Sequence, residues 1–184
     1  MNKNKVLYLF LILNLSSCAN VSNFNSYKSE NAGKITNIVI YAPSNSYASS
    51  REQEYEFCSA FLKEKVEAKC TSITANMPPG KQIDSNDVLS LSDKNASNHI
   101  VILQLSGADK TITHQLVTTD YSSNIVTSEK NNFRHLIQVL STKEAELAYS
   151  AEIESSDELS LSRKNYYKSL FGKIVMDWRK LGLL

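Results

Sequence analysis

Three cysteines and three histidines are the side chains of this 184-residue chain best suited to nucleophilic, metal-binding or acid–base chemistry. They are Cys18, Cys58, Cys70, His99, His114 and His135. Zinc sites place His and Cys at short fixed spacings, and hydrolases of the common α/β type set a serine between two glycines; the sequence shows neither pattern. Each histidine stands alone on a segment that we expect to be a strand. We therefore expect no catalytic residue, no metal and no cofactor, and predict that the protein is not an enzyme.

Cys18 ends a segment with the three-part layout of a secretory signal. Two lysines among the first five residues precede the apolar run VLYLFLILNL, and two serines precede the cysteine. The run is about half the roughly 20 residues that a membrane-spanning helix needs. Leu15-Ser16-Ser17-Cys18 resembles the lipobox of bacterial lipoproteins; the alternative is a buried N-terminal strand or helix with a chance cysteine. The resemblance implies that residues 1–17 are a signal peptide and that Cys18 is the lipidated residue.

The resemblance to lipoproteins also implies a location in the cell envelope. It implies diacylation of the Cys18 sulfur and acylation of its new amine, with chains such as palmitate. Two or more acyl chains anchor a protein stably, whereas one chain holds only marginally. Ala19 follows the cysteine, where lipoproteins retained in the inner membrane usually carry Asp. We therefore expect a protein anchored in the outer membrane and facing the periplasm.

Length and charge limit the class of partner. Without residues 1–17 the chain keeps 167 residues, enough for one domain with a real core. It then carries 18 Lys and Arg against 19 Asp and Glu, a net charge near −1. A nucleic-acid-binding protein would show a basic excess or stripe. We expect the membrane and an envelope protein as partners and no nucleic acid, while the oligomeric state stays open.

Cys58 and Cys70 leave two states open. An oxidising periplasm permits a disulfide between them. Cys58 is expected about two turns before the end of its helix, roughly 12 Å along the axis, whereas Cys70 begins the next strand near that helix end. Bridged cysteines need Cα atoms within about 7 Å of each other. The expected separation therefore favours two buried thiols over a bridge.

The chain is predicted to alternate strands and helices after a polar linker. Residues 18–34, rich in Asn and Ser, show no apolar periodicity and predict a flexible tether behind the lipid. Strands are expected at 35–42, 70–75, 99–106, 111–118, 133–141 and 146–153, where β-branched and aromatic residues gather. Gly107 ends the most apolar of them, and residues 120–132 are polar and poorly patterned. Residues 35–184 are expected to form a single periplasmic domain.

Capping residues mark the starts of three predicted helices. Ser49 begins the first, Asp84 or Ser85 the second, and residues 155–158 the third. The last is a long amphipathic helix with one apolar stripe. Tyr166 falls beside that stripe, which predicts an exposed ring.

The first predicted helix has an apolar side and a charged side. The apolar positions are Tyr55, Cys58, Phe61, Leu62 and Val66. The charged positions are Glu52, Glu54, Glu56, Lys63, Glu64 and Lys65. A run of charges is most often a solvated face, and the alternative is a docking face for a partner.

Together these elements predict an α/β (α+β) fold, with a mixed sheet of about five to six strands, helices packed on it and a long C-terminal amphipathic helix. Their order behind a lipobox resembles periplasmic α/β lipoproteins of the curli-secretion, penicillin-binding-protein-activator and lipid-transport-auxiliary types. The nearest local match covers residues 136–151. There the sequence STK at 141–143 stands where those families have an Asp-x-x-Thr-Gly-like turn, and YS at 149–150 stands where they have Trp-Ser.

This resemblance, with no visible reaction centre, leads to a class of function. We expect a non-enzymatic, lipid-anchored periplasmic protein that binds a protein partner in a secretion, cell-wall or transport assembly. One alternative is a lipid or small-molecule carrier of an envelope transport system, which requires an apolar cavity. Another is an immunity-type binder of a periplasmic toxin. An envelope hydrolase would need histidines that converge with serines or carboxylates in one cleft.

Overall fold

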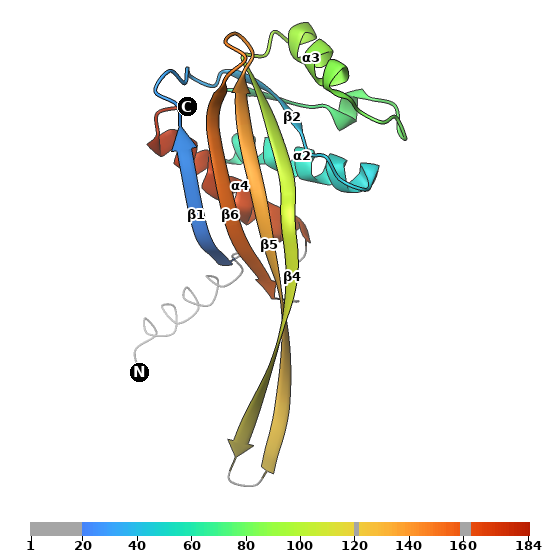
Figure 1. Ribbon diagram of the computed structural model, residues 1–184, viewed down its shortest axis with the longest axis vertical. Coiled ribbons are helices and arrows are strands. Elements are labelled where there is room, and N and C mark those ends of the chain that lie inside the picture. Colours follow the sequence, from blue (N-terminus) through green and yellow to red (C-terminus); the bar gives the residue numbers. More distant parts are fainter. Residues whose placement is uncertain (1–19, 120–121, 159–162) are drawn as a thin grey trace, which may run out of the picture.

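The computed structural model describes residues 20–119, 122–158 and 163–184. In chain order the elements are β1 (Asn20–Lys28), β2 (Asn37–Tyr41), α2 (Tyr47–Lys63), β3 (Lys69–Ser72), η1 (Thr74–Asn76), α3 (Ser85–Lys94), β4 (His99–Thr119), β5 (Ser122–Ser141), β6 (Leu147–Glu158) and α4 (Arg163–Lys180). The strands form one sheet in the order β1-β6-β5-β4-β2-β3 (Figure 1). The predicted mixed sheet with a C-terminal helix is confirmed. The predicted signal peptide and Cys18 lie outside the described residues.

The sheet is parallel on one side and antiparallel on the other. β2 runs parallel to both β3 and β4, because α2 and α3 each carry the chain across the sheet before the next strand. β4, β5, β6 and β1 then pair antiparallel in turn. The two halves meet at β4, the only described strand that pairs with both kinds of neighbour.

Alternating apolar residues let β2 bury both of its faces. Ile38 and Ile40 point into the larger core with α2 and α4, while Val39 points to the other face and packs with Val88 and Leu91 of α3. α2 and α4 thus cover one face of the sheet, and α3 covers the opposite face only near β2. The rest of that second face, over β5 and β6, is left uncovered in Figure 1.

Aromatic side chains fill the space between the sheet and the two large helices. Phe57 and Phe61 of α2 lie against Trp178 of α4, with ring centroids 5.8 and 6.0 Å apart. Tyr149 of β6 meets the same indole edge-on at 5.7 Å. Such tilted contacts add to the apolar area that each ring buries. The C-terminal tail joins this core, because Leu183 is fully buried and its carbonyl accepts a 2.7 Å bond from the Ile35 amide.

The prediction of a flexible tether over residues 18–34 was wrong for most of that segment. Asn20–Lys28 forms β1 and pairs antiparallel with β6 along its length. Only Val21 and Phe24 reach the core, and the register shifts between Val21 and Asn23. This bulge puts the two inward residues three positions apart, which hides the two-residue period of a strand.

The strands predicted at 133–141 and 146–153 are confirmed as parts of β5 and β6, which pair antiparallel, whereas the break predicted between 99–106 and 111–118 was wrong. β4 continues from His99 through a bulge at residues 105–107 to Thr119, so the predicted strand 111–118 belongs to it. β5 begins at Ser122, inside the segment expected to be a polar loop. Residues 155–158, expected to cap the last helix, end β6, and α4 begins at Arg163.

Two helix faces differ from their predictions. Glu54 and Glu56 of α2 are buried, whereas Tyr55 and Leu62 are exposed. Glu54 occupies a core position three residues before Phe57, where the ends of β2 and β3 supply hydrogen-bond donors. Tyr166 of α4 is buried rather than exposed, because its hydroxyl bonds with polar groups on β5 and β6.

Cys58 and Cys70 form a disulfide that ties α2 to β3, with Cα atoms 5.4 Å apart. The expected separation was too large because it left out the direction of β3. The chain leaves α2 after Lys63 and runs back beside the helix in an extended conformation, which rises about 3.3 Å per residue against 1.5 Å in a helix. A few extended residues therefore recover the length of two helical turns.

No helix within the described ranges has both the length and the apolar character to cross a membrane.

Candidate interaction site

β4 changes from a central strand to an edge strand partway along its length. His99–Ile102 pair with β2 on one side and with β5 on the other. From Leu103 onward, β4 pairs with β5 alone among the described strands, with a bulge at Ser106. Gln104, Leu105 and Ser106 are exposed accordingly, and the Leu105 side chain is 50% exposed. We call residues 103–119 the free edge of β4, a name that refers only to the backbone edge with no second described strand beside it.

The carboxylate of Glu54 fixes the place where β2 leaves β4. It accepts bonds from the amides of Ala42 and Thr74, at 3.0 and 2.8 Å, just beyond the ends of β2 and β3. It also accepts bonds from the hydroxyls of Ser72 and Thr74. Pro43, which has no amide hydrogen, then prevents further pairing. Burial raises the pKa of Glu54, and these four donors act in the opposite direction.

Beyond the body of the sheet, β4 and β5 continue as a two-stranded ribbon. β6 pairs with β5 only as far as Lys130, whereas β4 and β5 stay paired out to Thr119 and Ser122. We call residues 111–119 and 122–129 the arm. Its length is about 30 Å at the usual rise of a strand, and it projects well past the helices in Figure 1. Ile112, at its base, is 51% exposed.

A polar cleft lies beside the free edge, under the face that α2 and α4 cover. It has a volume of about 630 Å³ and is lined by Leu105, Gln53, His135, Arg163 and Tyr166 among others. The His135 Nε2 atom and the Tyr166 hydroxyl lie 2.7 Å apart, and that hydroxyl also bonds with Ser155.

The His135 group is poorly suited to catalysis. Burial lowers the pKa of His135 to about 4, so the ring is neutral and weakly basic at neutral pH. A general base works best with a pKa near the operating pH. Its Nδ1 atom has no hydrogen-bond partner among the described residues, so no carboxylate orients the ring as in a Ser-His-Asp triad. The three side chains instead tie β5, β6 and α4 together.

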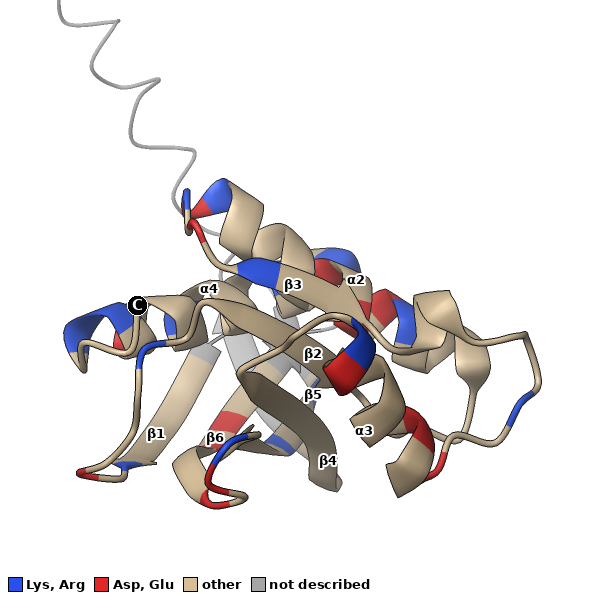
Figure 2. Cartoon of the chain, turned by 90° about the horizontal axis from the view of Figure 1, so that it is seen from above, with Lys and Arg blue, Asp and Glu red and all other residues tan. Residues whose placement is uncertain are grey.

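Among the described side chains, the candidate histidines His99 and His135 do not converge. His99 is buried at the start of β4, at the end of the sheet away from the arm, and its pKa is lowered by burial. The side chain of His114 and all of Cys18 lie outside what the structure describes. Within the described ranges no three His, Cys, Asp or Glu side chains are grouped to hold a metal ion. Lysines and acids are also intermixed on the helices seen from above (Figure 2).

The free edge and the arm are the features that sequence reasoning missed. The prediction that Gly107 ends a strand was wrong, because Gly107 lies at a bulge where the strand continues. The run TITHQLVT was predicted as a strand, whereas SSNIVTS, which also carries β-branched residues, was placed in a polar segment. Nothing in those runs showed that no third strand would cover them.

Known proteins resemble this chain in fold only. No protein-family model matches it, and no curated protein matches it in sequence. Its fold is similar to that of PelC from Paraburkholderia phytofirmans, a dodecamer seen in two crystal forms. The first gives a TM-score of 0.53 at 8% identity over 83% of this chain and 94% of PelC. The second gives 0.51 at the same identity and coverage.

A looser overlap exists with the lipoprotein GNA1162 from Neisseria meningitidis, with a TM-score of 0.40 at 7% identity over 79% of this chain and 96% of that one. The likeness to PelC shows the α+β fold of the present chain and leaves its role open.

Proposed function

We propose that this protein is a non-enzymatic lipoprotein, anchored through Cys18 in the outer membrane and facing the periplasm, that binds a protein partner through its β4–β5 arm. The arm carries the proposal. A strand edge presents unpaired amides and carbonyls, which another chain can extend as a further strand. Soluble proteins usually shorten or cover such edges, and this one extends for 17 residues from Leu103 to Thr119.

The partner lies on the membrane side of the domain. β1 begins at Asn20, two residues after Cys18. Across the sheet, Asn20 is level with Asp109 through the pairs Asn20–Ser156, Ser156–Asn132 and Asn132–Asp109. The arm continues from that level toward the end at which β1 begins (Figure 1). A lipid on Cys18 therefore directs the arm at the membrane, within reach of an envelope protein at its surface.

The other functions have less support. A lipid carrier needs an enclosed apolar cavity. Aromatic rings in contact occupy the space between the sheet and α2 and α4, and the apolar groove between β1 and α4 lies open at the surface. A hydrolase needs a base with a matched pKa, and His135 does not provide one. Assembly is in keeping with the fold, since PelC itself was solved as a dodecamer. An immunity-type binder of a toxin is one form of the same proposal.

The test compares the full chain with a variant that lacks the arm. Residues 111–130 are replaced by an Asn-Gly turn, which joins two strands tightly. Both proteins are captured from detergent-solubilised envelopes after cross-linking, and Leu89→Ala, an exposed change on α3, serves as the control. We expect a specific envelope protein with the full chain and the control, and its loss with the trimmed variant. Equal capture by the trimmed variant, or no specific protein with the full chain, would overturn the proposal.

A further inference from the structure

We propose that the part of the free edge nearest the body, Leu103–Asp109, pairs antiparallel with β1 of a second copy of this chain. The inference rests on the proposed binding function, and the second copy is the proposed partner of Leu103–Asp109 only. The arm beyond it stays available for an envelope partner. Copies joined in this way form a continuous sheet from one protomer to the next.

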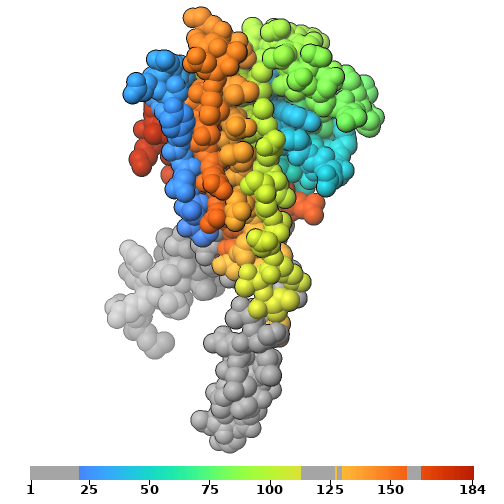
Figure 3. Space-filling view, in the orientation of Figure 1, coloured from blue at the N-terminus to red at the C-terminus, as the bar shows by residue number. Residues whose placement is uncertain are grey.

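The sheet has two free edges of useful length, on opposite sides. β1 is the outermost strand on one side and offers nine residues. The other side ends in β3, which has only four residues and is tied to α2 by the disulfide. Below the end of β2, however, β4 itself is outermost. Figure 3 shows β4 at the margin of the molecule there, beneath the helical part.

The two edges lie at the same height on the sheet. One row of paired residues runs Phe24, Ile153, His135 and Leu105, and the next runs Asn25, Glu152, Leu136 and Gln104. A second copy placed beside the first with no shift along the strands therefore sets residues 20–26 of its β1 against Leu103–Asp109, while Tyr27 and Lys28 fall level with the end of β2. The stretch lies on either side of the bulge at Ser106.

Strand direction permits this pairing. Three successive antiparallel steps separate β4 from β1, so the two strands run in opposite directions. A neighbour in the same orientation thus presents an antiparallel partner, the arrangement with perpendicular hydrogen bonds. The contact joins two different surfaces, so it repeats from copy to copy and forms a ring when the rotation closes.

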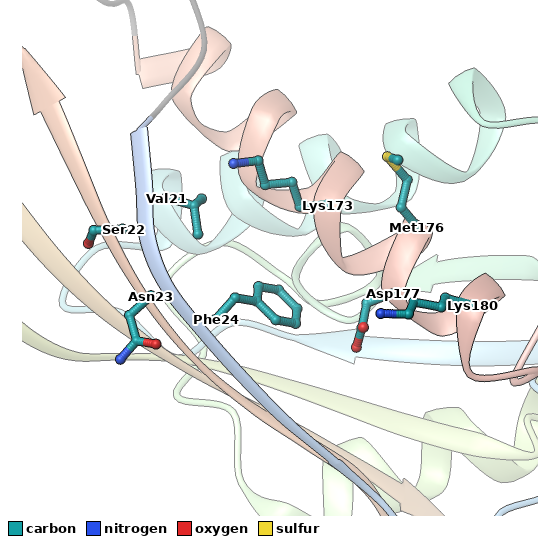
Figure 4. A pocket seen from close by; sticks show the side chains of 8 residues that line it. All are labelled: Val21, Ser22, Asn23, Phe24, Lys173, Met176, Asp177 and Lys180. Carbon is teal, nitrogen blue, oxygen red and sulfur yellow. The ribbon is translucent and has the colours of Figure 1, made fainter.

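Side chains at the two edges are also complementary. A groove of about 560 Å³ runs between β1 and α4, with Val21, Phe24 and Met176 on its wall (Figure 4). The Met176 side chain is 60% exposed. In the shared row, Leu105 of one copy falls opposite Phe24 of the next, and both lie on the helix-covered face. Leu105 would fill an apolar groove that its own protomer leaves empty.

The edge of β1 lacks the usual protection against pairing. Edge strands are commonly guarded by lysines or prolines, and the only charged residue of β1 is Lys28. Its Nζ atom is bonded to the Leu181 carbonyl at 2.9 Å. The remaining outward residues of β1 are Asn, Ser and Tyr, which a new strand can cover at small cost.

Cysteine pairs in the full chain test the contact. Asn25→Cys combined with Gln104→Cys places two exposed positions of one row at the new junction. Envelopes are oxidised gently and separated without reductant. We expect a ladder of dimers, trimers and larger species, because each chain contributes both halves of the junction. The control pair, Asn25→Cys with Lys143→Cys at the exposed β5–β6 turn, should give no ladder.

Two results would overturn the inference. One is the absence of a ladder with the Asn25 and Gln104 pair in a protein that keeps its wild-type melting temperature. The other is efficient dimer formation by either single variant, since that means that like edges meet. Both outcomes leave the arm intact, so capture of an envelope partner reports separately on the proposed function.

Discussion

The two halves of β4 have different surroundings. His99–Ile102 lie between two strands and beneath helices on both faces, whereas Leu103 onward has β5 as its only described strand neighbour. The backbone is continuous, so its own conformational preference does not set the boundary. The boundary lies where β2 ends, and Glu54 and Pro43 end β2. β4 therefore has an unpaired edge, open to another chain, beyond the point where β2 ends.

The largest contrast is expected between two leucines on the same face of β4. Leu103 is fully buried, and Leu105 is half-exposed. Leu103→Ala should lower the free energy of unfolding by about 2–5 kcal/mol, the usual cost of a core cavity. Leu105→Ala should cost less than about 1 kcal/mol, yet weaken association between copies. Urea unfolding and sedimentation of the two variants measure both effects; similar losses of stability would contradict the boundary at Leu103.

Acid should lower the stability of the fold through His135, which pairs with Leu105 at the free edge of β4. The pKa of His135 falls from 6.5 to about 4 on folding, because its ring is buried. The unfolded chain therefore binds the proton first, and stability is full above pH 6.5 and is lost as the pH falls toward 4. The loss reaches about 3 kcal/mol, at 1.36 kcal/mol per pKa unit.

His135→Gln removes this dependence but keeps a polar side chain near Tyr166. Denaturant unfolding between pH 7 and pH 4 should show a steeper fall for the wild type than for the variant. His99 shifts in the same direction and remains in both proteins, so the difference between them isolates His135. Parallel curves would show that the ring is solvated.

Substitution of Glu54, which holds the ends of β2 and β3, should lower the free energy of unfolding. Glu54→Gln keeps the size of the side chain but replaces one acceptor oxygen with a donor, which then faces backbone amides. Hydrogen bonds to charged groups are worth about 1.5–3 kcal/mol each, so we expect a loss of about 2–3 kcal/mol. Glu52→Gln, two residues earlier and paired only at 3.9 Å with exposed Arg163, should change stability by less than about 0.5 kcal/mol. Equal effects would rule out Glu54 as the anchor.

The smallest effect on folding is expected from removal of the arm. Apart from Thr111, which pairs with Lys130, the arm residues pair across the arm and with no third described strand, and the ribbon projects past the helices (Figure 1). Replacing 111–130 with an Asn-Gly turn should therefore alter the unfolding free energy by less than about 1 kcal/mol. A larger loss, measured by urea unfolding, would mean that the arm supports the body.

The same contrast explains which parts of the fold could be predicted from sequence. Ile38 to Ile40, Ile100, Val101, Leu103 and the stripe of α4 are buried, and burial demands apolar residues in a period that can be seen. The class of fold followed from them. β1 is paired by backbone hydrogen bonds and only Val21 and Phe24 reach the core, so its other side chains are free to be polar and show no clear period.

The remaining wrong predictions depend on contacts between residues far apart in the sequence. Glu54 belonged to a charged run, and only the ends of β2 and β3, 12 to 20 residues away, make its burial favourable. The fold of β3 beside α2 brought Cys70 to Cys58. The free edge of β4 depends on the early departure of β2. Each of these needs the arrangement of elements in space, which the local pattern of residues does not contain.

Hydrogen exchange along β4 tests the central claim most directly. The full chain is compared in intact envelopes and as dispersed single copies, and exchange is followed for the amides that do not bond to β5. We predict slow exchange at His99–Ile102 in both states, and exchange at Leu103–Thr119 that is fast in dispersed copies and slow in the envelope. Fast exchange at Leu103–Thr119 in both states would contradict the account, because the free edge would then have no partner.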